Sequence, residues 1–143
     1  PFVPAEKMQE EGVKPAATIE ELYSNCDYVS LHIPANDQTK NSINYELLSK
    51  MPKGACLVNT ARKEVINEAD MAKLLAERTD FKYVTDIAAG NNDELTAFAP
   101  RYFATPKKMG AQTAEANLNA GLAAANQIVG FLKDGNERFR VNK

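Results

Sequence analysis

Short apolar runs alternate along this chain with segments that carry helix signals, and this alternation limits the fold more than any other feature. The runs are residues 28–33, 55–60, 81–87 and 101–105. Strands of this length separated by helices of about ten residues form βαβ units and a parallel sheet. The runs lack strict polar alternation, as expected when helices cover both faces. The pattern predicts an α/β fold with a doubly wound parallel sheet.

Start and stop signals place the helices between these runs. Thr18, followed three residues later by Glu21, forms a capping box, and Asn67 is a second candidate N-cap. An Ala-rich helix much longer than the others ends before Gly135. Because of its length, we expect this last helix to leave the sheet and pack elsewhere. Helices are expected over residues 18–26, 44–51, 68–78 and 113–133.

Composition excludes several classes of protein. The 143 residues suffice for one domain, and 44% apolar with 25% charged residues is typical of a globular chain. The net charge of −2 provides no basic surface for nucleic acid. No apolar run reaches the roughly 20 residues of a membrane span, and the N-terminal residues do not resemble a signal peptide. Two cysteines and one histidine in no ligand-like spacing predict no metal site and a cytoplasmic location.

Residues that follow the strands are candidates for a site, because ligands of open α/β sheets bind outside the carboxyl ends of the strands. Arg62 follows the second run and either forks onto a substrate carboxylate or pairs at the surface with Glu64 or Glu68. Asp86 ends the third run and either binds a carboxamide or ribose or caps the next turn. His32, in the first run, is expected to be a buried histidine held by a backbone hydrogen bond.

Two adjacent lysines, Lys107 and Lys108, follow the fourth run. Neighbouring lysines in a loop are usually solvated. A short loop, however, directs one of them to the crevice, where partial burial beside other cations favours the neutral amine. Such an amine can take a proton from a substrate hydroxyl or form a Schiff base with a keto substrate. The chain has no G-x-G-x-x-G turn to receive a pyrophosphate.

The segments "CDYVSLHIPANDQTKNSINYELLSKMPKGACLVNTAR" and "VINEADMAKLL" resemble the second half of the NAD-binding domain of the D-isomer-specific 2-hydroxyacid dehydrogenases. The resemblance covers almost the whole chain and implies a Rossmann-like fold with NAD as the cofactor. It places the glycine fingerprint and the acidic residue for the adenosine ribose upstream of Pro1. It implies that residues 1–111 are the C-terminal half of that domain. Residues 112–143 are then a connecting helix and a tail returning to the substrate domain.

The resemblance also implies roles for individual residues. Arg62 matches the substrate-binding arginine, and Lys108 stands where the family has its catalytic histidine, so these two are the expected catalytic residues. The family's catalytic glutamate is replaced by Asn91, with Asp93 and Glu94 nearby but out of register, and Lys63 replaces a glycine. The residues expected to contact the cofactor are Ile33, Pro34, Thr60, Ala61, Arg62, Asp86, Lys108, Met109, Gly110 and Ala111.

The lysine at position 108 is shared with a group of short phosphoglycerate dehydrogenases in this family. The segments "NTARKEVINE" and "TPKKMGAQTAEAN" also resemble these enzymes. The resemblance therefore implies NAD-dependent oxidation of D-3-phosphoglycerate by a homodimeric enzyme of which this chain is the C-terminal part. Two alternatives stay open. One is another substrate of the family, such as glycerate, lactate or formate. The other is a non-catalytic NAD-sensing binding protein of the same fold.

Overall fold

The computed structural model describes residues 3–108 and 112–142. Residues 1–107 form one compact unit and residues 108–143 form a second. The first unit contains the sheet and the shorter helices, and the second contains the long C-terminal helix. Each is described by itself.

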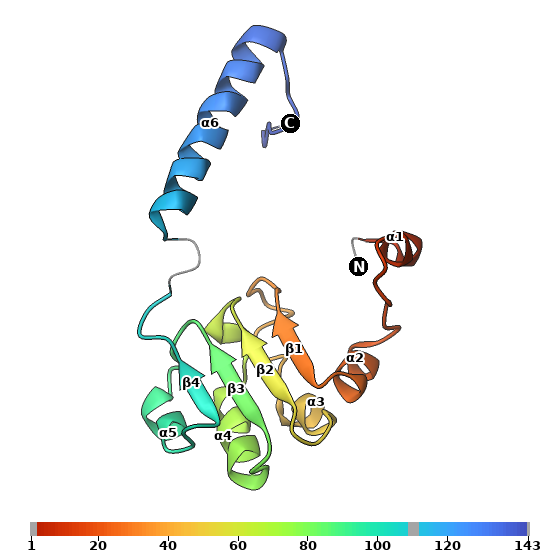
Figure 1. Ribbon diagram of the computed structural model, residues 1–143, viewed down its shortest axis with the longest axis vertical. Coiled ribbons are helices and arrows are strands. Elements are labelled where there is room, and N and C mark those ends of the chain that lie inside the picture. The colour runs from red at the N-terminus through yellow and green to blue at the C-terminus, as the bar shows by residue number, and fades with distance from the viewer. Residues whose placement is uncertain (1–2, 109–111, 143) are drawn as a thin grey trace. The chain divides into compact units, whose positions relative to one another are not determined.

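A four-stranded parallel sheet is the centre of the first unit (Figure 1). Its strands lie in the order in which they occur along the chain: β1 (Tyr28–Leu31), β2 (Cys56–Asn59), β3 (Lys82–Thr85) and β4 (Tyr102–Ala104). The four apolar runs therefore became the four strands, each shorter by one or more residues than the run that predicted it. The predicted α/β fold with a parallel sheet is confirmed.

Short helices precede β1 and connect the strands, and the N-caps of α2 and α4 follow the sequence signals. The Thr18 hydroxyl accepts the Glu21 N–H at 3.0 Å, and Asn67 accepts the Asp70 N–H at 3.2 Å. The Glu21 carboxylate accepts the N–H of Ala17, one residue before the cap. The sequence signals did not predict α1, α5 or the 3-10 helix η1. The helices of this unit are α1 (Ala5–Glu10), α2 (Ile19–Asn25), α3 (Tyr45–Ser49), η1 (Lys63–Val65), α4 (Glu68–Glu77) and α5 (Asn92–Thr96).

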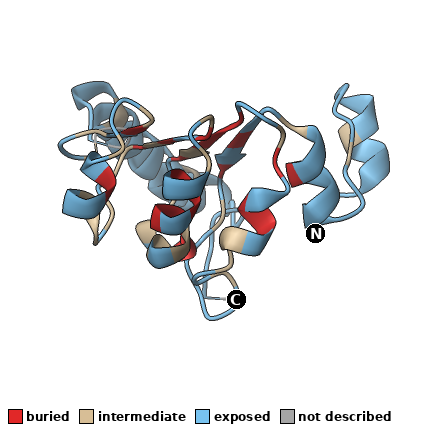
Figure 2. Cartoon of the chain, turned by 90° about the horizontal axis from the view of Figure 1, so that it is seen from below, coloured by how far each residue is buried: buried red, intermediate tan, exposed pale blue. Residues whose placement is uncertain are grey.

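One face of the sheet forms the core. Register brings Val29, Leu57, Tyr83 and Tyr102 into one row across all four strands, and each is at most 5% exposed. Leucines of α3, α4 and α5 pack against this row with Tyr23 of α2. Figure 2 shows the buried positions running along the strands and on the helices that lie along them. The core thus anchors the strands from which the strand-end segments emerge.

The opposite face of the sheet corrects the expectation that helices cover both sides. In the unit of residues 1–107, Tyr28 is 76% exposed and Phe103 is 57% exposed on this face. Ser30 is also exposed, and Val58 and Val84 are only half-buried. The helices between consecutive strands all return over the core face, so apolar strand residues on the other side are left uncovered within this unit.

The second unit contains α6 (Ala114–Asp134), the long C-terminal helix that the sequence predicted. Thr113 is its N-cap and accepts the Ala116 N–H at 3.0 Å. Gly135 ends it with φ of 64°, a left-handed conformation that favours glycine. No described residue of the helix is buried, and none of the described helices is long and apolar enough to cross a membrane. Both predicted ends of the helix are confirmed.

Candidate functional site

The carboxyl ends of the parallel strands lie at one edge of the sheet, where the arrowheads point in Figure 1. A hollow of about 530 Å³ opens at this edge between the segments that follow β1 and β2. It contains five of the predicted cofactor-contacting residues. Its lining residues are His32, Ile33, Pro34, Ala35, Thr60, Ala61 and Arg62. We call it the strand-end hollow.

Asn59 shapes the wall of the strand-end hollow that follows β2. This side chain is completely buried, its Oδ1 accepts the Ala61 N–H at 3.0 Å, and its Nδ2 donates to the Arg62 carbonyl at 3.0 Å. Through these two bonds, the Asn59 side-chain amide fixes the backbone of residues 60–62 in a closed loop. Sequence reasoning did not select Asn59 as a functional residue. The available signal was a polar residue ending an otherwise apolar strand.

Arg62 reaches solvent from this closed loop. Its side chain is exposed, and the guanidinium donates to the Ala61 carbonyl at 3.0 Å. Within the described part of the chain, it forms no ion pair with Glu64 or Glu68, the partners of the surface alternative. A guanidinium that lines a hollow without a paired carboxylate can bind an anionic ligand with its remaining N–H groups.

Asp86 follows β3 next to this loop. Its N–H donates to the Asn59 carbonyl at 3.2 Å, and its own carbonyl accepts the Thr105 hydroxyl at 3.0 Å. The Thr85 hydroxyl also donates to the Asn59 carbonyl at 3.0 Å. These bonds join the segments after β2, β3 and β4 side by side. Asp86 therefore lies at the same edge of the sheet as Arg62, as the sequence predicted.

Two buried phenols, Tyr83 and Tyr102, lie on the core face of β3 and β4. Burial raises the pKa of Tyr83 and of Tyr102, so both remain protonated donors near neutral pH. Tyr102 donates to the Asn92 side chain at 2.8 Å, and the Tyr83 hydroxyl accepts a weaker bond of 3.4 Å from Asn59. Tyr83 thus contacts the amide that holds residues 60–62, and Tyr102 contacts the start of α5.

His32 differs from its prediction. We expected a buried histidine with a backbone hydrogen bond, but its side chain is exposed and its Nε2 bonds to the Ser30 hydroxyl at 2.9 Å. The reason is that β1 ends at Leu31, one residue before the histidine. His32 consequently lines the strand-end hollow and not the core.

The two lysines after β4 are placed differently from each other. Lys107 is exposed and closes the first unit, whereas Lys108 is half-buried and opens the second. The Lys107 carbonyl accepts the Thr105 hydroxyl at 3.1 Å. Met109, Gly110 and Ala111, which were expected to contact the cofactor, lie outside the described residues. The role of Lys108 beside Arg62 stays a prediction.

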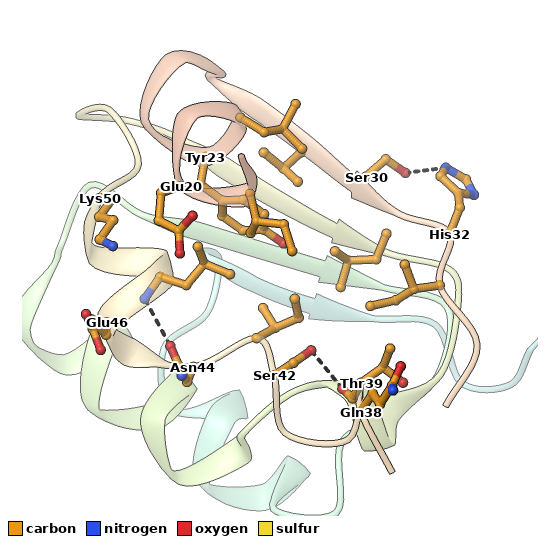
Figure 3. A pocket seen from close by; sticks show the side chains of 17 residues that line it. Glu20, Tyr23, Ser30, His32, Gln38, Thr39, Ser42, Asn44, Glu46 and Lys50 are labelled. Atoms are coloured by element: carbon orange, nitrogen blue, oxygen red, sulfur yellow. Dashed lines mark hydrogen bonds between the residues drawn. The ribbon is translucent and has the colours of Figure 1, made fainter. Parts of the chain in front are cut away.

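A second hollow of about 540 Å³ lies at β1, between α2 and α3 (Figure 3). Apolar side chains such as Tyr23 and Leu47 line it, and Glu20, Glu46 and Lys50 are its charged lining residues. These charged groups come from α2, α3 and the C-cap of α3 rather than from the ends of strands. The strand-end hollow, with its arginine and its adjacent aspartate, therefore fits a small anionic ligand and its cofactor better.

Comparisons with known proteins agree with this placement. Residues 1–107 match the family described as D-isomer specific 2-hydroxyacid dehydrogenase, NAD binding domain. A D-3-phosphoglycerate dehydrogenase of Haemophilus influenzae is 32% identical over 136 residues, which are 90% of this chain and 33% of that protein. A formate dehydrogenase of Neurospora crassa is 42% identical over 71 residues, which are 50% of this chain and 19% of that protein.

A solved structure extends the similarity to the whole chain. It is the NAD+-bound 3-phosphoglycerate dehydrogenase of Entamoeba histolytica, which has 43% sequence identity and a TM-score of 0.83. The alignment covers 100% of this chain and 45% of that one, so this chain spans less than half the length of these relatives. The match of residues 1–107 is decisive: the chain belongs to the D-isomer specific 2-hydroxyacid dehydrogenases, and this part of it is from their NAD-binding domain.

Proposed function

We propose that this chain is the C-terminal part of an NAD-dependent D-3-phosphoglycerate dehydrogenase, which oxidises its substrate to 3-phosphohydroxypyruvate, the first step of serine biosynthesis. The proposal depends mainly on the position of Arg62, which lines the strand-end hollow and whose backbone carbonyl accepts a hydrogen bond from Asn59. The choice of substrate is supported by the phosphoglycerate dehydrogenases that match 90% and 100% of this chain.

The strand-end hollow fits the nicotinamide end of the cofactor. It has a volume of about 530 Å³ and an apolar side formed by Ile33 and Pro34, against which a flat ring can pack. Thr60 and Ala61 provide the opposite wall, and Asp86 at the next strand end offers a carboxylate to a carboxamide. Bound NAD supplies a hydride acceptor. From the family resemblance, Lys108, Met109, Gly110 and Ala111 complete the proposed contacts.

The chain's own residues then have separate tasks. Arg62 binds the carboxylate of the hydroxy acid and stabilises negative charge that develops on the C2 oxygen. Lys108 takes the proton from the C2 hydroxyl, the task of a histidine elsewhere in the family. Asn91, in the position expected for a glutamate, is a neutral amide whose Nδ2 donates to the Glu68 carbonyl and to the Glu94 carboxylate. The loss of the glutamate charge suits a lysine base, because an anion near the lysine favours the charged ammonium.

A second candidate is a formate dehydrogenase, because the Neurospora crassa enzyme has 42% identity over half of this chain. Steady-state kinetics of the complete enzyme with NAD and a panel of D-3-phosphoglycerate, D-glycerate, D-lactate and formate separates the two. We expect kcat/KM to be highest for D-3-phosphoglycerate. A higher value for formate or for an unphosphorylated acid overturns the assigned substrate, and no turnover with any of them overturns the proposed activity.

We also propose an oligomeric state and a cellular location for the complete enzyme. The family resemblance supports a homodimer in the cytoplasm. Light scattering of the complete enzyme tests the dimer, and a monomeric mass contradicts it.

A further inference from the structure

Glu68 connects helix α4 to the loop that follows β3. It is the first residue of α4, and its Oε1 accepts the Gly90 N–H at 2.5 Å. Its backbone carbonyl accepts the Asn91 Nδ2 at 3.2 Å. Two consecutive residues of the loop are therefore held by one residue that lies 22 positions earlier in the chain.

Gly90 makes this close approach possible. A Cβ atom at this position would lie 2.6 Å from the Glu68 Oε2 and 3.3 Å from its Oε1. Any side chain here therefore pushes the carboxylate away from the Gly90 N–H. A glycine at the end of the loop is needed for contact with Glu68, and not for an unusual backbone angle, since Gly90 is absent from the positive-φ residues.

The loop from Asp86 to Asn91 is held at both of its ends. At its start, the Thr85 hydroxyl accepts the Ile87 N–H at 3.2 Å and donates to the Asn59 carbonyl. At its end, Glu68 holds Gly90 and Asn91. The few residues between these anchors leave Asp86 little freedom to move away from the strand-end hollow.

We infer that Glu68 is a positioning residue, whose carboxylate holds residues 86–91 in the shape that presents Asp86 to the cofactor. The inference rests on the proposed function, because Asp86 acts on the nicotinamide only in a dehydrogenase of this family. Glu68 itself is not among the residues that line the strand-end hollow. Glu68 affects the affinity for the cofactor, because it keeps residues 86–91 ordered. It does not affect the transfer of the proton.

Three variants of the complete enzyme test this role. Glu68→Ala removes the acceptor, Gly90→Ala displaces it, and Glu68→Gln keeps an oxygen that accepts the Gly90 N–H. Glu46→Ala is the matched control, since Glu46 is also an acidic residue in the first turn of an asparagine-capped helix. The described part of the chain shows no hydrogen bond between Glu46 and residues 86–91.

The first measurement is amide hydrogen exchange without cofactor. We expect exchange of the N–H of residue 90 to become at least about tenfold faster in Glu68→Ala and Gly90→Ala, since its acceptor is removed or displaced. In these two variants, exchange in β3 should stay as in the unsubstituted protein. In Glu68→Gln and Glu46→Ala, exchange at residue 90 should also stay unchanged. Unchanged exchange at Gly90 in Glu68→Ala overturns the inference.

The second measurement is steady-state kinetics with NAD and D-3-phosphoglycerate. Losing a hydrogen bond to a charged group should raise the KM for NAD about tenfold in Glu68→Ala and Gly90→Ala. We expect kcat to stay within about threefold, because the proton-transfer groups are untouched, and Glu68→Gln to restore most of the affinity. An unchanged KM in both variants, or a Glu68→Gln variant as impaired as Glu68→Ala, overturns the inference. If the unsubstituted enzyme has no turnover, the proposed function fails first and the inference with it.

Discussion

Replacing Asn59 with alanine tests the buried amide on which the strand-end hollow depends. The substitution removes the acceptor of the Ala61 N–H and the donor to the Arg62 carbonyl, two bonds of 3.0 Å made by a side chain that is 0% exposed. A buried polar group that loses its partner costs about 1–3 kcal/mol. Two such groups, Ala61 N–H and Arg62 C=O, sum to about 2–6 kcal/mol, and we expect the free energy of unfolding to fall by the lower part of this range, because Ala61 is half-buried and Arg62 is exposed. The vacated volume adds to this cost.

Urea unfolding measures this change as a lower midpoint at an unchanged slope. Asn67→Ala is the matched control, because it is the same substitution at a half-buried asparagine whose side chain caps one N–H, that of Asp70. We expect the control to cost about 1 kcal/mol, the usual value for an N-cap. Equal costs for the two variants refute the reasoning, since they mean that the Asn59 bonds contribute no more than a half-buried cap.

The remaining predictions concern charged side chains. Arg62→Lys keeps the charge but loses the bidentate geometry, so kcat/KM of the complete enzyme should fall about 100-fold with little change in NAD affinity; unchanged kinetics contradict a role in substrate binding. Lys108→Ala should lower kcat by about two to four orders of magnitude, and Lys107→Ala far less; equal effects contradict the assignment of the base to Lys108. Arg78, with Gly54 N–H, holds the pKa of Asp80 well below its usual range. The free energy of unfolding should therefore fall as pH drops below about 4, where the unfolded carboxyl takes up its proton; Asp80→Asn should flatten this dependence, measured by urea unfolding across pH.

Local signals in the sequence determined the elements of this fold. Thr18, Asn67 and Gly135 are helix boundaries in the structure, because caps act on N–H and C=O groups within a few residues. The four apolar runs became the strands because their β-branched and aromatic residues favour extended backbone and one face of each run is buried in the core. The position of Arg62 after β2 could be predicted because the apolar run of residues 55–60 ends just before it. None of these conclusions needs contacts between distant parts of the chain.

Tertiary structure decided what surrounds these elements. The burial of His32 depended on whether β1 included it, and pairing with β2 ended the strand at Leu31. The uncovered face of Tyr28 and Phe103 depended on the side over which each helix returned. The anchoring role of Glu68 was invisible in the sequence because its partner, Gly90, is 22 residues away and is reached only when α4 packs into the core of the unit. Pairing between distant residues is set by the packing of whole elements, and local sequence signals carry no information about that packing.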